Sequence, residues 1–161
     1  MTNVELITTP LTELHNIRQF DCGIAELNSW LTDRALKNQS QFSQTYVCLK
    51  NDQVIGYYAL AAGSVQRISL PANQQRNTPD SIPTFLLARL AVDQNFHGQG
   101  IGSDLIRDAL IRCVVATEQV AAYVLQVHAT NDEAIKFYLR NSFVQSPIEA
   151  SVLFFKLPRI R

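Results

Sequence analysis

Three glycines at alternating positions, Gly98, Gly100 and Gly102, separate an apolar run from an amphipathic segment. The run Phe85–Val92 predicts a buried strand, and apolar residues at helical spacing over 105–114 predict a helix. Free backbone N–H groups at the start of a helix, together with the helix dipole, form a binding site for anions. Glycines let the backbone approach such a ligand closely. The turn is therefore a candidate site for a phosphate or pyrophosphate.

The glycine spacing also excludes two common nucleotide motifs. G-x-G-x-G is not the G-x-G-x-x-G dinucleotide fingerprint, and no Gly-Lys-Ser/Thr follows as in a P-loop. Hydride transfer and nucleoside triphosphate hydrolysis therefore lose support. A tight strand-to-helix turn that uses glycines only for their positive φ is the alternative interpretation, and the turn alone does not decide between the two.

The spacing of the cysteines and histidines indicates no disulfide framework, metal site or catalytic triad. Cys22, Cys48 and Cys113 are odd in number and form no C-x-x-C pair, which argues against a disulfide framework and against a zinc site. His15 and His128 have no partner spaced for metal binding or for a catalytic triad. We expect no metal site and a reducing compartment.

The elements around the turn predict an α+β (mixed α/β) fold. Apolar residues from Ile24 to Ala35 predict a helix that Asp21 could cap, and Thr45–Leu49 with Val54–Ala62 predict an antiparallel hairpin. A long surface loop, or a loop with one short helical turn, is expected over Gln66–Pro83. After the glycines and their helix, the expected elements are a strand over Val120–Val127, a helix over Asn131–Arg140 and a strand over Val152–Leu157. This order predicts one mixed sheet, antiparallel in its first half, with helices on both faces.

Length and charge indicate how many domains to expect and which partners the chain can bind. The chain has 161 residues, so we expect a single domain over 1–161. Fourteen basic and fourteen acidic residues give a net charge of zero, so a polyanion must be held by a local patch. Neither an apolar run of 18 residues nor a secretory signal after Met1 is visible, so we expect a cytoplasmic protein with no membrane partner.

Several segments resemble the GNAT superfamily of N-acetyltransferases. Leu90-Ala91-Val92-Asp93 followed by His97-Gly98-Gln99-Gly100-Ile101-Gly102 resembles its acyl-CoA motif. Asn131-x-x-Ala134-x-x-Phe137-Tyr138 and then Phe143 resemble its last helix and strand. Phe20-Asp21-Cys22-Gly23 and Gly56-Tyr57-Tyr58-Ala59-Leu60 look like the GNAT toxins of bacterial toxin–antitoxin pairs. The resemblance covers nearly the whole chain. His97 is a departure, because the family usually has Gln or Arg there.

The resemblance implies acetyl-CoA as co-substrate and direct transfer in a ternary complex. Backbone groups of the strand would bind the pantetheine arm, and the glycine turn would bind the pyrophosphate; Asn131 would either cap its helix or bond the pantetheine arm. The implied cofactor-binding residues are Leu90, Ala91, Val92, His97, Gly98, Gln99, Gly100, Ile101, Gly102, Ser103 and Asn131.

Tyr138 is the catalytic residue that the resemblance implies. Amine attack on a thioester releases a thiolate, and a phenol with a pKa of about 10 stays protonated at pH 7 and can donate a proton to that sulfur. Without the family context, a tyrosine near the end of an amphipathic helix is more often a packing residue.

The acceptor implied by the toxin branch is the α-amine of aminoacyl-tRNA, whose acetylation blocks translation. Binding tRNA requires basic side chains, and the candidates are Arg34, Lys37, Arg76 and Arg89. The branch also implies a small DNA-binding antitoxin as inhibitor, and often a homodimer. A GNAT enzyme acting on a small amine or a protein N-terminus, and a CoA-binding module without catalysis, are the alternatives.

Overall fold

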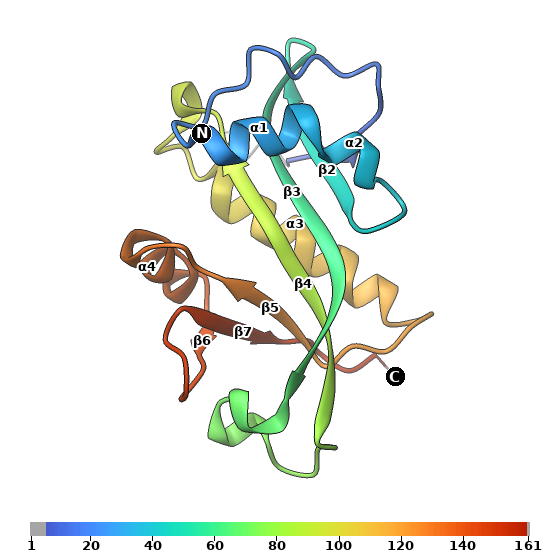
Figure 1. Ribbon diagram of the computed structural model, residues 1–161, viewed down its shortest axis with the longest axis vertical. Helices are drawn as coiled ribbons and strands as arrows, with labels where there is room; N and C mark the ends of the chain where they lie inside the picture. Colours follow the sequence, from blue (N-terminus) through green and yellow to red (C-terminus); the bar gives the residue numbers. More distant parts are fainter. Residues whose placement is uncertain (1–5, 161) are drawn as a thin grey trace. The chain divides into compact units, whose positions relative to one another are not determined.

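The computed structural model describes residues 6–160, and the chain forms two compact units. The first unit holds residues up to 61 and 88–109, and the second holds 62–87 and the residues from 110 onward. In chain order the elements are β1 (Thr8–Pro10), α1 (Ala25–Asp33), α2 (Ala35–Asn38), β2 (Gln44–Lys50), β3 (Gln53–Gln66), η1 (Arg67–Ser69), η2 (Ala72–Gln74), β4 (Ser81–Val92), η3 (Gln94–Phe96), α3 (Ile101–Ala116), β5 (Val124–His128), α4 (Asp132–Arg140), β6 (Val144–Gln145) and β7 (Val152–Lys156) (Figure 1).

The strands form one seven-stranded mixed sheet in the order β1-β2-β3-β4-β5-β7-β6. β1, β2 and β3 pair antiparallel, β4 and β5 pair parallel, and β7 pairs antiparallel with both β5 and β6. The expected mixed sheet with an antiparallel first half is confirmed.

In the first unit, the hairpin of β2 and β3 is closed by Asn51 and Asp52. Both residues have positive φ, 52° and 63°, which suits a two-residue turn of the type that matches strand twist. Adjacent strand residues point to opposite faces of the sheet. The Tyr57 hydroxyl accordingly donates to the Leu27 carbonyl of α1, whereas the Tyr58 hydroxyl donates to Asp108 of α3. Helices therefore cover both faces of this hairpin.

The start of α1 differs from the expected cap at Asp21. Ile24 is the N-cap residue and makes no side-chain capping bond. The Asp21 carboxylate instead accepts hydrogen bonds from the Gly23 N–H and the Asn28 side chain, both at 2.9 Å. Gly23 has φ +88°, so the turn before the helix favours glycine. The hydrogen bonds with Gly23 and Asn28 lower the pKa of Asp21.

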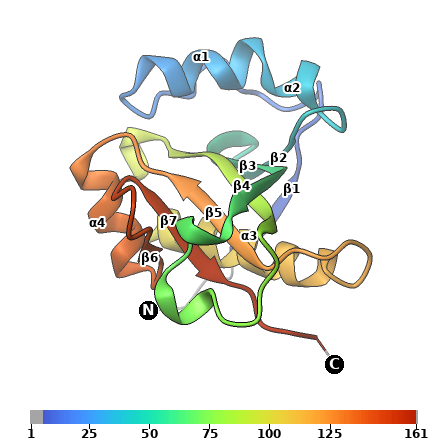
Figure 2. The same cartoon turned by 60° about the horizontal axis from the view of Figure 1, so that its bottom comes forward.

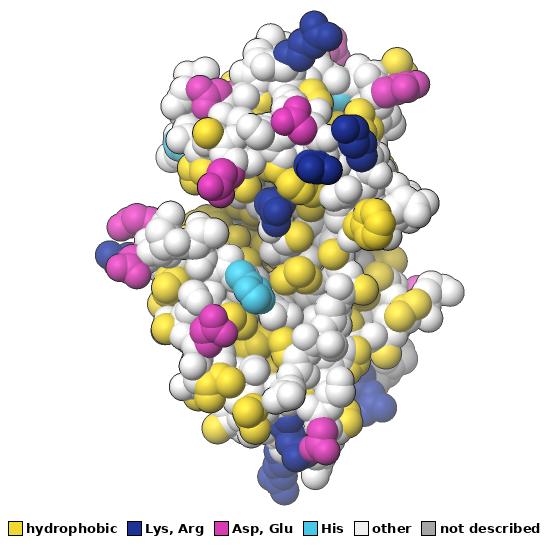
Figure 3. All heavy atoms as spheres, in the orientation of Figure 1, with side chains coloured by type: hydrophobic (Ala, Val, Ile, Leu, Met, Phe, Trp, Pro, Cys, Tyr) yellow, Lys and Arg dark blue, Asp and Glu magenta, His cyan; other side chains and the backbone are white. Residues whose placement is uncertain are grey.

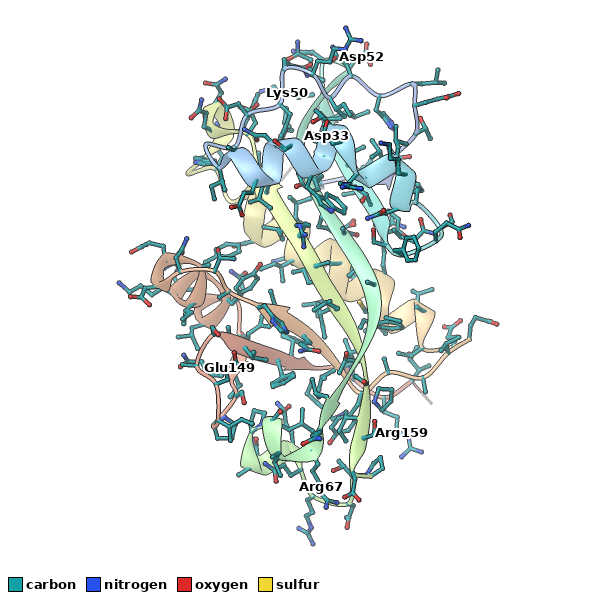
Figure 4. All side chains as sticks on the ribbon, in the orientation of Figure 1. Asp33, Lys50, Asp52, Arg67, Glu149 and Arg159 are labelled. Carbon is teal, nitrogen blue, oxygen red and sulfur yellow. The ribbon has the colours of Figure 1, made fainter. Side chains whose placement is uncertain are left out.

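The second unit contains β5, β7, β6 and α4, with the connection from β3 to β4 (Figure 2). Its core is formed by Leu70, Ile82, Val124, Val152 and Phe154. The expected long loop is shorter than Gln66–Pro83, because β3 runs to Gln66 and β4 begins at Ser81, and the rest contains η1 and η2. Arg67, labelled in Figure 4, ties this connection together through an ion pair with Asp80 at 2.7 Å.

Strands β5 and β6 also differ from expectation. β5 begins at Val124, not at Val120, which is 67% exposed and precedes the strand. The apolar pattern did not indicate β6, because its two residues are too few for an alternating pattern to show. Over the described residues, no helix is long and apolar enough to cross a membrane.

Candidate active site

The glycine turn connects β4 to α3 in the first unit. Asp93 is buried, and its carboxylate accepts hydrogen bonds from the N–H groups of Asp21 at 3.1 Å and Asn95 at 2.9 Å. Gly98 and Gly100 have φ of +76° and +80°, and a Cβ built on either would meet no atom within 4 Å. The backbone conformation therefore favours glycine here, and the space beside both residues is open.

The N–H groups of this turn are available to a ligand. α3 begins at Ile101, and the Asp104 N–H makes the first bond of the helix, 3.0 Å to the Gly100 carbonyl. Within the described chain, the N–H groups of residues 98–103 donate to no acceptor. Such orphan donors with the positive end of a helix dipole fit a pyrophosphate, although the Asp104 carboxylate in the first turn partly opposes it.

His97 makes a contact that sequence reasoning did not anticipate. Its Nε2 lies 2.7 Å from the Val92 carbonyl oxygen, so Nε2 carries a hydrogen and donates a hydrogen bond to that carbonyl at the end of β4. This hydrogen bond connects the start of the glycine turn to the end of β4. A phosphate contact by His97 would have to use the other ring nitrogen.

The residues predicted for the pantetheine arm lie at the end of β4. Ala91 is buried, and Leu90 and Val92 are half-buried. Parallel pairing of β4 with β5 covers Thr84–Leu87 and, in the described chain, does not extend to these three residues. Their backbone groups on that side therefore have no β5 partner.

Tyr138 lies in the second unit and is the buried residue of α4. It is 7% exposed, and its ring meets those of Phe137 and Phe143 edge-on, each at 5.3 Å between centroids. Its hydroxyl makes no hydrogen bond with the described residues. Burial raises the pKa of Tyr138 above its ordinary value of 10. At pH 7 the Tyr138 hydroxyl is therefore protonated, and within the described residues its O–H donates no hydrogen bond.

Asn131 is the N-cap of α4. Its side-chain oxygen accepts a hydrogen bond of 2.8 Å from the Ala134 N–H. Of the two roles that the sequence left open, the structure shows the cap. The side-chain NH₂ group remains the part that can contact a cofactor.

The four basic residues predicted to bind an acceptor are all exposed. Arg34, Lys37 and Arg89 belong to the first unit, and Arg76 belongs to the second. Figure 3 shows Lys and Arg side chains gathered over α1 and α2, with Asp and Glu side chains among them. Arg89 lies over the ring of Trp30, with its guanidinium carbon 5.2 Å from the ring centre.

Sequence reasoning missed a polar chain at the end of β5. The Thr84 hydroxyl donates to the Gln126 carbonyl oxygen at 3.2 Å, and the Gln126 amide donates to Nε2 of His128 at 2.9 Å. The proton of a neutral His128 therefore sits on Nδ1, and that side chain is exposed. No spacing rule connects residues 84, 126 and 128, because the chain forms only when β4 and β5 pair.

The three cysteines are buried and free. Burial raises the pKa of Cys48 and of Cys113 to about 12 and also raises that of Cys22. All three are therefore poor nucleophiles at pH 7. The described residues contain no group of three or more His, Cys, Asp or Glu side chains placed to hold a metal ion.

Comparison with protein families matches residues 41–145 to the acetyltransferase (GNAT) domain. A curated relative, the tRNA-acetylating toxin of Mycobacterium tuberculosis, is 40% identical over 140 residues, which cover 86% of this chain and 84% of the relative.

Solved structures agree with this match. The toxin AtaT complexed with acetyl-methionyl-tRNAfMet is 31% identical, with a TM-score of 0.87 and 94% of each chain covered. A tyrosine-to-phenylalanine mutant of AtaT bound to acetyl-CoA and to the C-terminus of the antitoxin AtaR is 28% identical, with a TM-score of 0.79, and the match covers 96% of this chain and 94% of that one.

Proposed function

Because this chain belongs to the acetyltransferase (GNAT) domain family, we propose that it transfers the acetyl group of acetyl-CoA to the α-amine of aminoacyl-tRNA. Such a transfer removes the charged tRNA from translation, which is the action of a toxin. The M. tuberculosis relative is a tRNA-acetylating toxin, and AtaT is solved with the acetylated product. Both relatives support this acceptor for the present chain.

The observation that carries the proposal is the glycine turn. Gly98 and Gly100 hold the backbone in a conformation that favours glycine, the space beside them is open, and the N–H groups of residues 98–103 are unused. These groups would hold the pyrophosphate, and the backbone of Leu90 and Val92 would orient the pantetheine arm. When bound, acetyl-CoA supplies an acetyl thioester that an amine can attack.

Tyr138 is the proposed general acid. Its hydroxyl would give a proton to the sulfur as the carbon–sulfur bond breaks, and the amine would lose a proton as the amide forms. Burial keeps this hydroxyl protonated at pH 7. An α-amine has a pKa of about 8, so a large fraction is neutral without a dedicated base. Direct transfer also needs no nucleophilic cysteine, in agreement with three buried thiols.

The proposal includes a partner and a compartment. A small DNA-binding antitoxin would hold the enzyme inactive, as supported by the AtaT structure bound to the C-terminus of AtaR. The cytoplasm is the proposed compartment, because aminoacyl-tRNA is found there. Homodimerisation and a single domain over 1–161 stay predictions.

Labelled acetyl-CoA tests the acceptor when it is supplied in parallel with charged tRNA, deacylated tRNA, polyamines and peptides. The proposal expects label on charged tRNA alone, since only that RNA presents an α-amine. Label on polyamines or peptides alone would replace the toxin by a GNAT enzyme of small amines. Acetyl-CoA binding with no label on any acceptor would favour a binding module.

A further inference from the structure

A column of aromatic rings lies behind Arg89 in the first unit. Trp30 stacks on Tyr57 with 5.9 Å between centroids and 12° between planes, and Phe20 also contacts Tyr57, edge-on with 5.5 Å between centroids. We call Trp30, Tyr57 and Phe20 the aromatic column. The Arg89 guanidinium lies over its outer member, 5.2 Å from the Trp30 ring centre. The exposed, positively charged guanidinium of Arg89 therefore covers the Trp30 end of the column.

The column is anchored at Tyr57, the ring that both other members contact. Tyr57 is fully buried, and its hydroxyl donates to the Leu27 carbonyl of α1 at 2.7 Å. Trp30 is on the same helix and is half-buried. A ring packed against a fixed tyrosine, on a helix bonded to that tyrosine, has little freedom to move. Trp30 thus offers Arg89 a fixed platform.

Arg89 itself is exposed and has no acidic partner. Its Nη1 donates to the Ala88 carbonyl at 2.8 Å, and within the described chain no carboxylate pairs with it. Arg34 follows Trp30 by one helical turn, and its backbone N–H donates to the Trp30 carbonyl at 2.9 Å. A guanidinium that is held in place by a ring and a carbonyl, yet lacks a counter-ion, suits an external anion.

We propose that Trp30 is a positioning residue, which holds the Arg89 guanidinium in the orientation that binds a phosphate of the acceptor tRNA. This inference rests on the proposed acceptor. Arginine has a planar fork of donors that matches a phosphate, and a fork already held in place loses less conformational entropy on binding. The role of Trp30 is therefore exerted through Arg89 and not through its own contact with RNA.

A double-mutant cycle on Trp30→Leu and Arg89→Gln tests this role in steady-state acetylation of aminoacyl-tRNA. Arg89→Gln should raise the KM for the tRNA about tenfold, and Trp30→Leu should raise it about threefold. In the Arg89→Gln background, Trp30→Leu should add less than about 1.5-fold, because the two act as one unit. Changes in kcat should stay within about twofold in all three variants.

Salt dependence gives a second readout. Loss of one phosphate contact should reduce the slope of log affinity against log salt by about 0.7 to 0.9 in Arg89→Gln. Trp30→Leu should lower the slope in the same direction, and Trp30→Phe, which keeps a ring under the guanidinium, should restore most of it. A merely structural tryptophan would leave this slope unchanged.

Lys50→Gln is the matched control. Lys50 lies over the Phe96 ring at 5.3 Å and is labelled in Figure 4 near the hairpin of β2 and β3, so the variant also removes the cation of a cation–π pair. It should leave the KM for tRNA and the salt slope unchanged. Acetyl-CoA binding by calorimetry checks that every variant is folded, and Trp30→Phe replaces Trp30→Leu in the cycle if the latter is not.

Failure of the inference is distinct from failure of the proposed function. If the wild-type enzyme acetylates no aminoacyl-tRNA, the proposed acceptor is wrong and the inference falls with it. If the wild-type enzyme does so and the effects of Trp30→Leu and Arg89→Gln simply multiply, the platform role is overturned while the function stands. Unchanged KM in Arg89→Gln would also overturn it, since no phosphate contact would then exist.

Discussion

The glycine turn is open beside Gly98 and Gly100 and offers the backbone N–H groups of residues 98–103, whereas Tyr138 is 7% exposed and offers one hydroxyl among aromatic rings. In the turn, the proposed pyrophosphate binding depends on the absence of side chains at Gly98 and Gly100. At Tyr138, it depends on neighbours that exclude water and raise the pKa of the phenol. Binding and proton donation therefore rest on different physical features, so mutations should separate them.

The largest expected effect is on turnover in Tyr138→Phe. This change keeps the ring between Phe137 and Phe143 and removes only the proton donor. Acetyl transfer should fall by a factor of roughly 10² to 10⁴, with acetyl-CoA affinity retained. Thiol release and calorimetry measure the two quantities.

Tyr123→Phe is the control for that change. Tyr123 is in the same unit, and its hydroxyl donates to the Gln74 carbonyl at 3.0 Å. Its loss should leave turnover within about twofold of wild type, since this hydroxyl is already engaged. Wild-type turnover in Tyr138→Phe would return Tyr138 to a packing role.

Gly100→Glu should have the next largest effect, and on binding instead of turnover. A Cβ at Gly100 meets no atom within 4 Å, so strain at φ +80° and the new negative charge are the two costs. Like charge against a pyrophosphate should raise the Kd for acetyl-CoA about 100-fold. Calorimetry on the folded variant measures it.

Gly100→Gln separates charge from strain. It has nearly the same shape and the same φ as Gly100→Glu, but no charge. Its Kd should rise about tenfold less than that of Gly100→Glu, because the repulsion is absent. Equal and unaltered affinity in both variants would remove the pyrophosphate from this turn.

Asn131→Ala should have the smallest effect, on stability. Loss of the bond to the Ala134 N–H should lower the free energy of unfolding by about 1 kcal/mol, while Asn131→Ser keeps a cap. Urea unfolding at pH 7 compares the two. If both variants also weaken acetyl-CoA binding equally, the Asn131 amide contacts the cofactor in addition to capping α4.

The turn was more predictable from sequence than the hydrogen bonds around it. Alternating glycines between an apolar run and an amphipathic segment indicated a strand, a turn and a helix, and β4 and α3 confirm that order. The pattern held no information on His97, whose ring bonds the Val92 carbonyl five residues earlier. Asp21 was wrongly expected to cap α1, since Gly23 and Asn28 compete for the same carboxylate.

Long-range pairs were beyond sequence reasoning. Trp30 and Arg89 are 59 positions apart in the numbering, and only the packing of α1 against β3 and β4 in the first unit brings them together. The Thr84, Gln126 and His128 chain likewise requires the register of β4 with β5. For Tyr138, the family resemblance indicated the residue, while its burial was visible only in the structure.

The position of the transferred acetyl group tests the central claim most directly. After reaction of aminoacyl-tRNA with acetyl-CoA and the wild-type enzyme, nuclease digestion releases the terminal adenosine with its amino acid for mass spectrometry. The account predicts N-acetylaminoacyl-adenosine as the only acetylated product and none from deacylated tRNA. Acetyl groups on a base or a ribose, with the α-amine unmodified, would contradict it.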